Sequence, residues 1–273
     1  RGHAAAGSCG MRLHGGGMPG IMMKARLFPP YGVKPRPALR SSTARVHSLE
    51  RGLLSLSGGK IRAFIACILL ACCTAPAPVS AHAAESIPRA AYQHRDTLIR
   101  AAHAVWGLDA PVATLAAQVH TESLWKADAV SPVGAMGIAQ IMPSTARWLP
   151  DIAPALRGES PAPYNPGWAL RAMCEYDLWL YDRQSAMSAG ATLAPCDRMS
   201  FALSGYNGGL GWVRKDRSKA RDRGLDPDRY AAVATVNAGR SRAAWKENRD
   251  YVRRIMARQE LYLSWGPGVA CED

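Results

Sequence analysis

The sequence predicts a mainly helical domain over residues 84–273, preceded by segments of a different composition. From residue 90 onward, apolar residues recur at spacings of three and four, which is the period of a helix that buries one face. No segment alternates apolar and polar residues in the way that a half-buried strand does. A stretch of this length fits one domain with a hydrophobic core of its own.

Four helices are expected, over residues 90–106, from Pro111 to about Glu122, and over residues 168–184 and 245–263. Pro111 suits the first turn of its helix, where the backbone N–H would have no intrahelical partner. A further helix is expected to begin at Pro143. The prolines of residues 151–166 indicate a loop, and residues 198–204 are expected to lead into a glycine-rich turn.

The net charge of +13 comes mostly from the first part of the chain. Of the 34 Lys and Arg and the 21 Asp and Glu residues, 11 basic residues and the single acidic residue Glu50 precede residue 84. The remainder is close to neutral, which argues against nucleic-acid binding as the function. The basic run of residues 213–223 is interpreted as a solvated helix or loop, with weak attraction to anionic polymers as the alternative.

Residues 53–83 have the parts of a secretory signal peptide. Lys60 and Arg62 precede an apolar run over residues 63–75, and small residues around Ala81 and Ala83 form a cleavage site. The run is shorter than a membrane-spanning helix requires. A lipoprotein signal ending at Cys72 and an uncleaved anchor are the alternatives. Residues 1–52 are rich in Gly, Pro and Arg and are interpreted as a disordered or non-native leader. The chain is therefore expected to be exported to the periplasm or cell envelope.

Three cysteines would remain after cleavage, namely Cys174, Cys196 and Cys271. Cys174 falls within a predicted helix and suits a buried thiol. Cys196 and Cys271 lie beside Pro or Gly in expected loops, and in an oxidising compartment we predict a disulfide between them. The cysteine spacing does not support a zinc site, and neither a metal nor another cofactor is predicted.

Glu122 is the candidate catalytic residue. It lies three residues after Val119 and seven after Leu115, so it should sit at the edge of an apolar stripe near the end of its helix. Partial desolvation raises the pKa of a carboxyl group, which keeps a proton available for a leaving oxygen near neutral pH. The alternative is an ordinary glutamate facing solvent. Asp128, the nearest second carboxylate, is interpreted as a surface residue of the following loop.

Three further blocks supply candidate substrate-binding residues. The first runs from Ser131 through Gly134 and Gly137 to Pro143, and its glycines permit a tight turn that a ligand can approach. The second, residues 204–209, contains an aromatic ring beside an amide, and the third surrounds a tyrosine at residue 251. The candidate substrate contacts are Ser131, Gln140, Met142, Tyr206, Asn207 and Tyr251.

With these blocks in this order, residues 95–260 resemble the lytic transglycosylases of the soluble, goose-lysozyme-like (SLT) class. The resemblance implies a lysozyme-like helical fold that cleaves the β-1,4 bond between N-acetylmuramic acid and N-acetylglucosamine in peptidoglycan. It also implies that Glu122 alone performs both proton transfers and leaves a 1,6-anhydro ring, without water. The chain differs mildly from the family, with Ser204-Gly205 before Tyr206 and with Ile138 where leucine is common.

Three other functions stay open at this point. A lysozyme-type muramidase would cut the same bond with water. A component of an envelope-spanning machine would only bind glycan, although the intact Glu122 argues against that. A phage lysis enzyme would share the chemistry. The expected partners are peptidoglycan strands, with envelope-spanning machinery as a further candidate, and the expected state is a monomer.

Overall fold

The computed structural model describes residues 85–188 and 193–271, and every structural statement below concerns these residues. The predicted leader (1–52) and signal peptide (53–83) lie outside them. The described residues are mainly helical, and their strand-like pairing is limited to the isolated bridges of Met136 with Val130 and with Ile141. The prediction of a mainly helical domain is confirmed.

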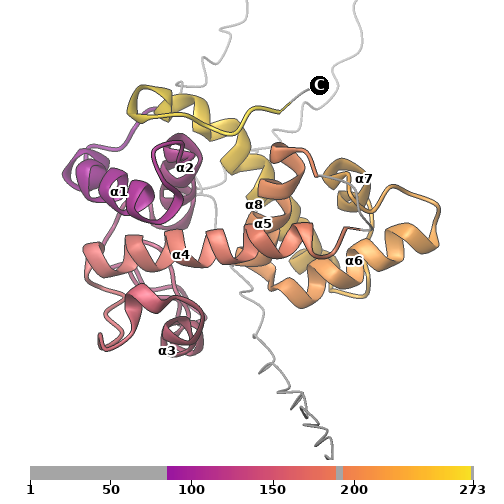
Figure 1. The fold of residues 1–273 in the computed structure, drawn as a ribbon, viewed down its shortest axis with the longest axis horizontal. Coiled ribbons are helices and arrows are strands. Elements are labelled where there is room, and N and C mark those ends of the chain that lie inside the picture. Colours follow the sequence, from indigo (N-terminus) through magenta and orange to yellow (C-terminus); the bar gives the residue numbers. More distant parts are fainter. Residues whose placement is uncertain (1–84, 189–192, 272–273) are drawn as a thin grey trace, which may run out of the picture. The chain divides into compact units, whose positions relative to one another are not determined.

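The helices follow one another along the chain as Figure 1 labels them. They are α1 (Ala91–Trp106), α2 (Val112–Ser123), α3 (Pro143–Ile152), α4 (Pro166–Ser185), α5 (Pro195–Gly208), α6 (Leu210–Asp222), α7 (Tyr230–Ala234) and α8 (Arg242–Arg258). The short 3₁₀ helices η1 (Pro154–Leu156) and η2 (Gln259–Trp265) accompany α3 and α8. Among the described residues, no helix has both the length and the apolar character needed to cross a membrane.

The long helix α4 connects the N-terminal helices α1 and α3 to α5. It packs against α1 and α3 and, at its other end, against α5, so that it runs across the middle of Figure 1. The side chain of Asn165 caps its first turn by accepting a hydrogen bond from the N–H of Trp168, and Pro166 occupies the first helical position. These two residues explain why the predicted loop ends where it does.

Helix α2 is buried on almost every side. It packs against α1, α8 and η2, and of its twelve residues only Thr121 is not buried. The sequence predicted one apolar stripe on this helix. The buried surface of α2 is wider than that, because the helix is covered on almost every side and lies in the interior. This burial brings the polar side chains of Gln118, His120 and Glu122 into the core.

Two predicted loops are wrong. The segment after Ser204 is not a turn, because α5 continues to Gly208 and buries every residue from Met199 to that point. Residue 196 also lies in the first turn of α5 rather than in a loop. The helix predicted over residues 245–263 is not one α-helix throughout. Its α-helical part, α8, ends at Arg258, and the chain continues as the 3₁₀ helix η2.

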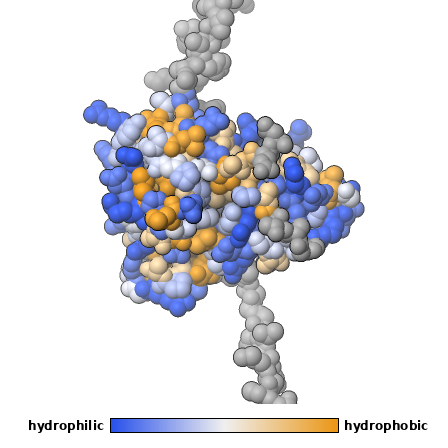
Figure 2. All heavy atoms as spheres, turned by 45° about the horizontal axis from the view of Figure 1, so that its top comes forward, coloured by the Kyte–Doolittle hydropathy of each residue, from blue (hydrophilic) through white to orange (hydrophobic). Residues whose placement is uncertain are grey.

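The basic run of residues 213–223 lies largely in α6. Arg214, Lys215 and Arg221 face solvent, and this end of the molecule is mostly hydrophilic at the right of Figure 2. Asp216 and Arg217 differ, because both are almost completely buried. The interpretation as a solvated helix holds for one face only, and the other face carries charge into the interior.

A disulfide between Cys196 and Cys271 joins the start of α5 to the C-terminal segment. That segment also contacts α2, because the carbonyl of Pro267 accepts from the N–H of Ala113 at 2.9 Å and the N–H of Val269 donates to Thr114 Oγ1 at 3.1 Å. The disulfide therefore fastens a segment that covers the N-terminal half of α2. Cys174 is a buried free thiol in α4.

Candidate functional site

Glu122 lies in the last turn of α2 and is only 1% exposed. Its Oε1 accepts a hydrogen bond of 2.7 Å from the hydroxyl of Tyr251, which α8 brings from 129 residues later in the chain. Tyr251 is equally buried. The alternative of a glutamate facing solvent is thereby excluded, and two of the predicted site residues are in direct contact.

The chain turns sharply after Glu122. Leu124 and Trp125 both have positive φ angles, of 54° and 65°, which are unusual for residues with a side chain. The hydroxyl of Ser123 donates to the carbonyl of Ile138 at 2.7 Å and so fixes the helix end to the loop that follows. This turn places residues 131–141 beside the carboxyl-bearing end of α2.

A buried aromatic network holds this turn in place. The indole Nε1 of Trp125 donates to the hydroxyl of Tyr262 at 2.8 Å, and this hydroxyl lies 3.0 Å from Nδ1 of His120. His120 precedes Glu122 by two residues on α2. The network thus braces the helix end from the side of η2, and its members were not predicted because they come from distant segments.

Ser131 and the glycines after it build a tight loop. The hydroxyl of Ser131 accepts from the N–H of Ala135 at 2.9 Å, and its carbonyl accepts from the N–H of Gly134 at 2.9 Å. At Gly137, with φ of 70°, a Cβ atom would lie 1.8 Å from the carbonyl oxygen of Pro163. Ser131 is therefore seen in a turn, and Gly137 is required by the close approach of another loop.

Gln140 is completely buried and has a positive φ of 48°. Its Nε2 donates to the carbonyls of Ala129 at 3.1 Å and Gly137 at 3.0 Å, so the amide holds the loop together. Met142 is half-buried and immediately precedes α3. Of these two candidates, the structure gives Gln140 a role in the loop and leaves Met142 at its edge.

Tyr206 faces the same loop from α5. Its hydroxyl donates to the carbonyl of Ala139 at 2.8 Å, and its ring packs 5.2 Å from that of Tyr176. The residue is 5% exposed. The ring of Tyr206 is thus covered by the protein, and its hydroxyl fastens the 131–141 loop to α5.

Asn207 and Asn248 form a buried amide pair between α5 and α8. The Nδ2 of Asn248 donates to Oδ1 of Asn207 and to the carbonyl of Ser204, both at 2.9 Å. The Oδ1 of Asn248 accepts from the hydroxyl of Ser204 at 2.8 Å and from Nη1 of Arg249 at 2.7 Å. Asn248 was not predicted, although its position three residues before Tyr251 on the same helix could have indicated it.

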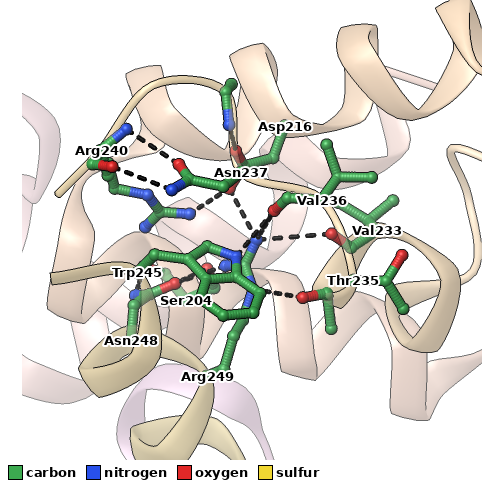
Figure 3. Close-up of polar contacts among 12 residues, drawn as sticks. Ser204, Asp216, Val233, Thr235, Val236, Asn237, Arg240, Trp245, Asn248 and Arg249 are labelled. Atoms are coloured by element: carbon green, nitrogen blue, oxygen red, sulfur yellow. Dashed lines mark hydrogen bonds and ion pairs between the residues drawn. The ribbon is translucent and has the colours of Figure 1, made fainter. Parts of the chain in front are cut away.

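Behind Asn248 lies a buried charge cluster, drawn in Figure 3. Oδ2 of Asp216 accepts from Nη2 of Arg249 at 2.7 Å and also from Nη2 of Arg240. Burial has the largest effect on the pKa of Arg240 and lowers it. The Asp216 carboxylate raises this pKa, and the nearby charge of Arg249 lowers it. No sequence pattern predicted this cluster, because its three members come from three separate segments.

Asp177 is a further buried carboxylate near α2. Its Oδ1 accepts from Nε2 of Gln118 at 3.2 Å, and Gln118 lies one turn before Glu122. Burial is the main cause that raises the pKa of the Cys174 thiol and of Tyr176, with the charge of Asp177 adding to both. Asp128, by contrast, is exposed, as predicted. Within residues 85–188 and 193–271, no three His, Cys, Asp or Glu side chains are grouped to hold a metal ion.

Comparison with known families gives a match over residues 98–228 to the model described as the transglycosylase SLT domain. The resemblance inferred from the sequence blocks is confirmed. The matched range contains Glu122, Tyr206 and Asn207 and ends before Asn248 and Tyr251.

Two curated relatives cover part of the same region. The membrane-bound lytic murein transglycosylase F of Pasteurella multocida is 31% identical over 119 residues, which are 44% of this chain and 21% of that protein. The corresponding protein of Mannheimia succiniciproducens is 32% identical over 119 residues, 44% of this chain and 22% of that protein. The chain thus matches about a fifth of the length of these relatives.

Two solved structures align with part of this chain. The 70 kDa soluble lytic transglycosylase of Escherichia coli aligns with a TM-score of 0.47 and 23% identity, over 64% of this chain and 25% of that chain. An inactive mutant of the lytic transglycosylase Slt from Pseudomonas aeruginosa aligns with a TM-score of 0.48 and 22% identity, over 65% and 25%.

Proposed function

We propose, from the match of residues 98–228 to the model of the transglycosylase SLT domain, that this chain is a peptidoglycan lytic transglycosylase. The observation that carries the proposal is the Glu122 carboxyl group, buried at the end of α2 and bonded to the hydroxyl of Tyr251. The bond cut is the β-1,4 linkage between N-acetylmuramic acid and N-acetylglucosamine. The product ends are 1,6-anhydro-N-acetylmuramic acid.

The proposed reaction needs one acid that later acts as a base. Glu122 donates its proton to the glycosidic oxygen, and the carbonyl oxygen of the muramic N-acetyl group attacks the anomeric carbon as the bond to the leaving oxygen breaks. The Glu122 carboxylate then takes the proton of the C6 hydroxyl, whose oxygen attacks the same carbon as the bond from that carbon to the N-acetyl carbonyl oxygen breaks. Glu122 ends protonated, and no water is consumed.

The role of Tyr251 in this scheme follows from its hydrogen bond. Its hydroxyl donates to Oε1 of Glu122, so it stabilises the carboxylate form and orients the group. Because the tyrosine is itself buried, this contact lies in the protein interior. Hydrogen bonds to charged groups are stronger there than in bulk water. Tyr251 is thus proposed to position Glu122.

The remaining site residues divide by the contacts that they already make. Ser131, Gln140 and Tyr206 use polar atoms within the protein, so we assign them to shaping the loop that the glycan meets. Met142 and Asn207 are assigned to direct contact with the sugar. Met142 offers a flexible apolar wall at the loop edge, and Asn207 offers an amide.

The location is also a proposal. We infer that residues 53–83 direct export, that residues 1–52 form a leader, and that the domain over 84–273 acts as a monomer on glycan strands in the periplasm or cell envelope. Anchoring as a lipoprotein and contact with envelope-spanning machinery remain part of the proposal. Fractionation of cells expressing the full chain, with sequencing of its mature N-terminus, tests the export signal directly.

The reaction is tested by mass spectrometry of the products released from purified peptidoglycan. A lytic transglycosylase gives products lighter by one water molecule than hydrolysed fragments, with anhydro ends. Glu122→Gln should lower their formation by roughly a thousandfold or more while the protein stays folded by circular dichroism. Asp128→Asn, which alters an exposed carboxylate six residues away, is the matched control and should keep full turnover.

Other products would change the assignment. Reducing muramic ends would indicate a muramidase that uses water, and Asp177 would then be the first buried carboxylate to test. Folded protein that binds glycan but releases nothing would favour a binding component of the envelope. Full turnover by a folded Glu122→Gln variant would contradict the proposed mechanism.

A further inference from the structure

The amide pair between α5 and α8 has a defined direction. Arginine can only donate hydrogen bonds, so the atom of Asn248 that faces Nη1 of Arg249 at 2.7 Å must be its oxygen. The other atom of the same amide is then the NH₂ group. It faces the carbonyl of Ser204, which can only accept, so both contacts require the same orientation.

The orientation of the Asn248 side-chain amide determines the orientation of the Asn207 side-chain amide. The NH₂ group of Asn248 donates at 2.9 Å, and therefore the atom of Asn207 that it meets must be the oxygen. The NH₂ group of Asn207 points elsewhere. Its nitrogen is buried and has no hydrogen-bond partner within the described part of the chain.

The buried cluster of Asp216, Arg240 and Arg249 holds the guanidinium group that faces Asn248. The carboxylate of Asp216, 1% exposed, accepts from Arg249 and Arg240, and its Oδ1 accepts from the N–H of Ala238 at 3.0 Å. Arg249 also donates through Nε to the carbonyl of Ala234 and through Nη2 to that of Val236, both at 3.1 Å. With its guanidinium held from several sides, Arg249 cannot turn away from Asn248.

Gly208 permits the close contact between the two helices. A Cβ atom there would lie 2.9 Å from Nδ2 of Asn248 and 3.2 Å from Nη1 of Arg240. A side chain at this position would push α8 away from α5 and break the amide pair. The glycine directly after Asn207 is thus explained by the positioning of Asn248.

We propose that Asp216, Arg249 and Asn248 form a positioning series that makes the side-chain amide of Asn207 a hydrogen-bond donor to the ligand. The ligand group that it selects is then an acceptor without a proton to give, such as the carbonyl oxygen of an N-acetyl group, rather than an ammonium. The assignment of a glycan as the ligand rests on the proposed function, whereas the direction of the amide rests on the contacts above. An unsatisfied buried donor next to a bound sugar favours a carbonyl over an analogue that lacks it.

The decisive change is Asn248→Asp. It keeps the shape and the contact with Arg249 but replaces the NH₂ group that faces Asn207 with an acceptor, so the Asn207 amide should rotate and donate inward. The probe is chitotetraose, whose N-acetyl carbonyls are acceptors, bound to the Glu122→Gln protein in a calorimeter. We expect the Kd to rise roughly tenfold or more, in line with a lost buried hydrogen bond.

Ser204→Ala is the matched control. It removes one hydrogen bond from the same oxygen of Asn248 and leaves every donor and acceptor direction unchanged, so its Kd should stay within about twofold of the parent protein. Asn248→Ala is the second variant, which adds no charge and leaves the Asn207 amide unheld. Equal weakening by Ser204→Ala and Asn248→Asp, or unchanged binding in folded Asn248→Asp and Asn248→Ala, would overturn the proposal.

A measurement without ligand separates this inference from the proposed function. The side-chain NH₂ resonances of Asn207, followed by ¹⁵N NMR, should shift strongly in Asn248→Asp and little in Ser204→Ala. Unchanged resonances in folded Asn248→Asp would contradict the positioning series even if the enzyme cuts peptidoglycan. Shifted resonances in a protein that releases no glycan product would support the series and contradict only the assigned function.

Discussion

At Glu122, the proposed chemistry depends on a hydroxyl group that Tyr251 supplies from another helix. The bond from Tyr251 is short, direct and buried at both ends. A donor in this position stabilises the carboxylate that forms when Glu122 gives up its proton, so it helps the proposed step in which Glu122 protonates the leaving oxygen. We therefore predict a kinetic role for the Tyr251 hydroxyl that is separate from the packing of its ring.

Tyr251→Phe keeps the ring and removes only this donor. We expect kcat on peptidoglycan to fall roughly tenfold, with the melting temperature changed by only a few degrees, because one hydrogen bond to a charged group is lost. Turnover and thermal unfolding measured on the same preparation check this. Tyr262→Phe is the control, since its hydroxyl serves Trp125 and His120 and its loss should reduce stability more than kcat.

At the scale of elements, the 131–141 loop is fastened on three sides. Ser123 holds it to α2, Tyr206 holds it to α5, and Gly137 lets the loop containing Pro163 approach. Its own amide, that of Gln140, closes it from within. Such a loop keeps its form when no ligand is present, which is what a preorganised binding wall needs.

Gly137→Ala should lower the free energy of unfolding by about 3 kcal/mol, because strain at a positive φ is joined by a clash with the Pro163 carbonyl. Gly134→Ala provides the comparison. Its φ is 81°, yet nothing lies within 4 Å of the added Cβ, so only the strain of about 1 kcal/mol applies. Urea unfolding of both variants measures the difference, and equal losses would show that the close approach is unimportant.

Across the whole molecule, the disulfide joins segments that support two of the helices carrying candidate site residues. Cys196 begins α5, which carries Asn207, and Cys271 ends the segment that covers α2, which carries Glu122. The pair is 75 residues apart in sequence. A link across a long loop mainly restricts the unfolded chain, so its removal should affect stability more than the local geometry of the site.

Replacing both cysteines, as Cys196→Ser with Cys271→Ser, should reduce the free energy of unfolding by about 4 kcal/mol. Dithiothreitol should have the same effect on the unmodified protein and none on the double variant. Melting curves with and without the reductant test this. A reductant effect of equal size on both proteins would mean that the stability comes from elsewhere.

Helix period and proline placement were enough to predict the helical class, the positions of most helices, and Glu122 at the end of the second one, because both are local properties of the sequence. The tertiary structure decided which side chains face which. It buried all but one residue of α2, extended α5 through the expected turn, and directed Gln140 and Tyr206 into the protein. It also brought Asp216, Arg249 and Asn248 behind Asn207. A buried polar group must find its partner wherever packing provides one, and packing joins segments whose separation along the chain carries no signal.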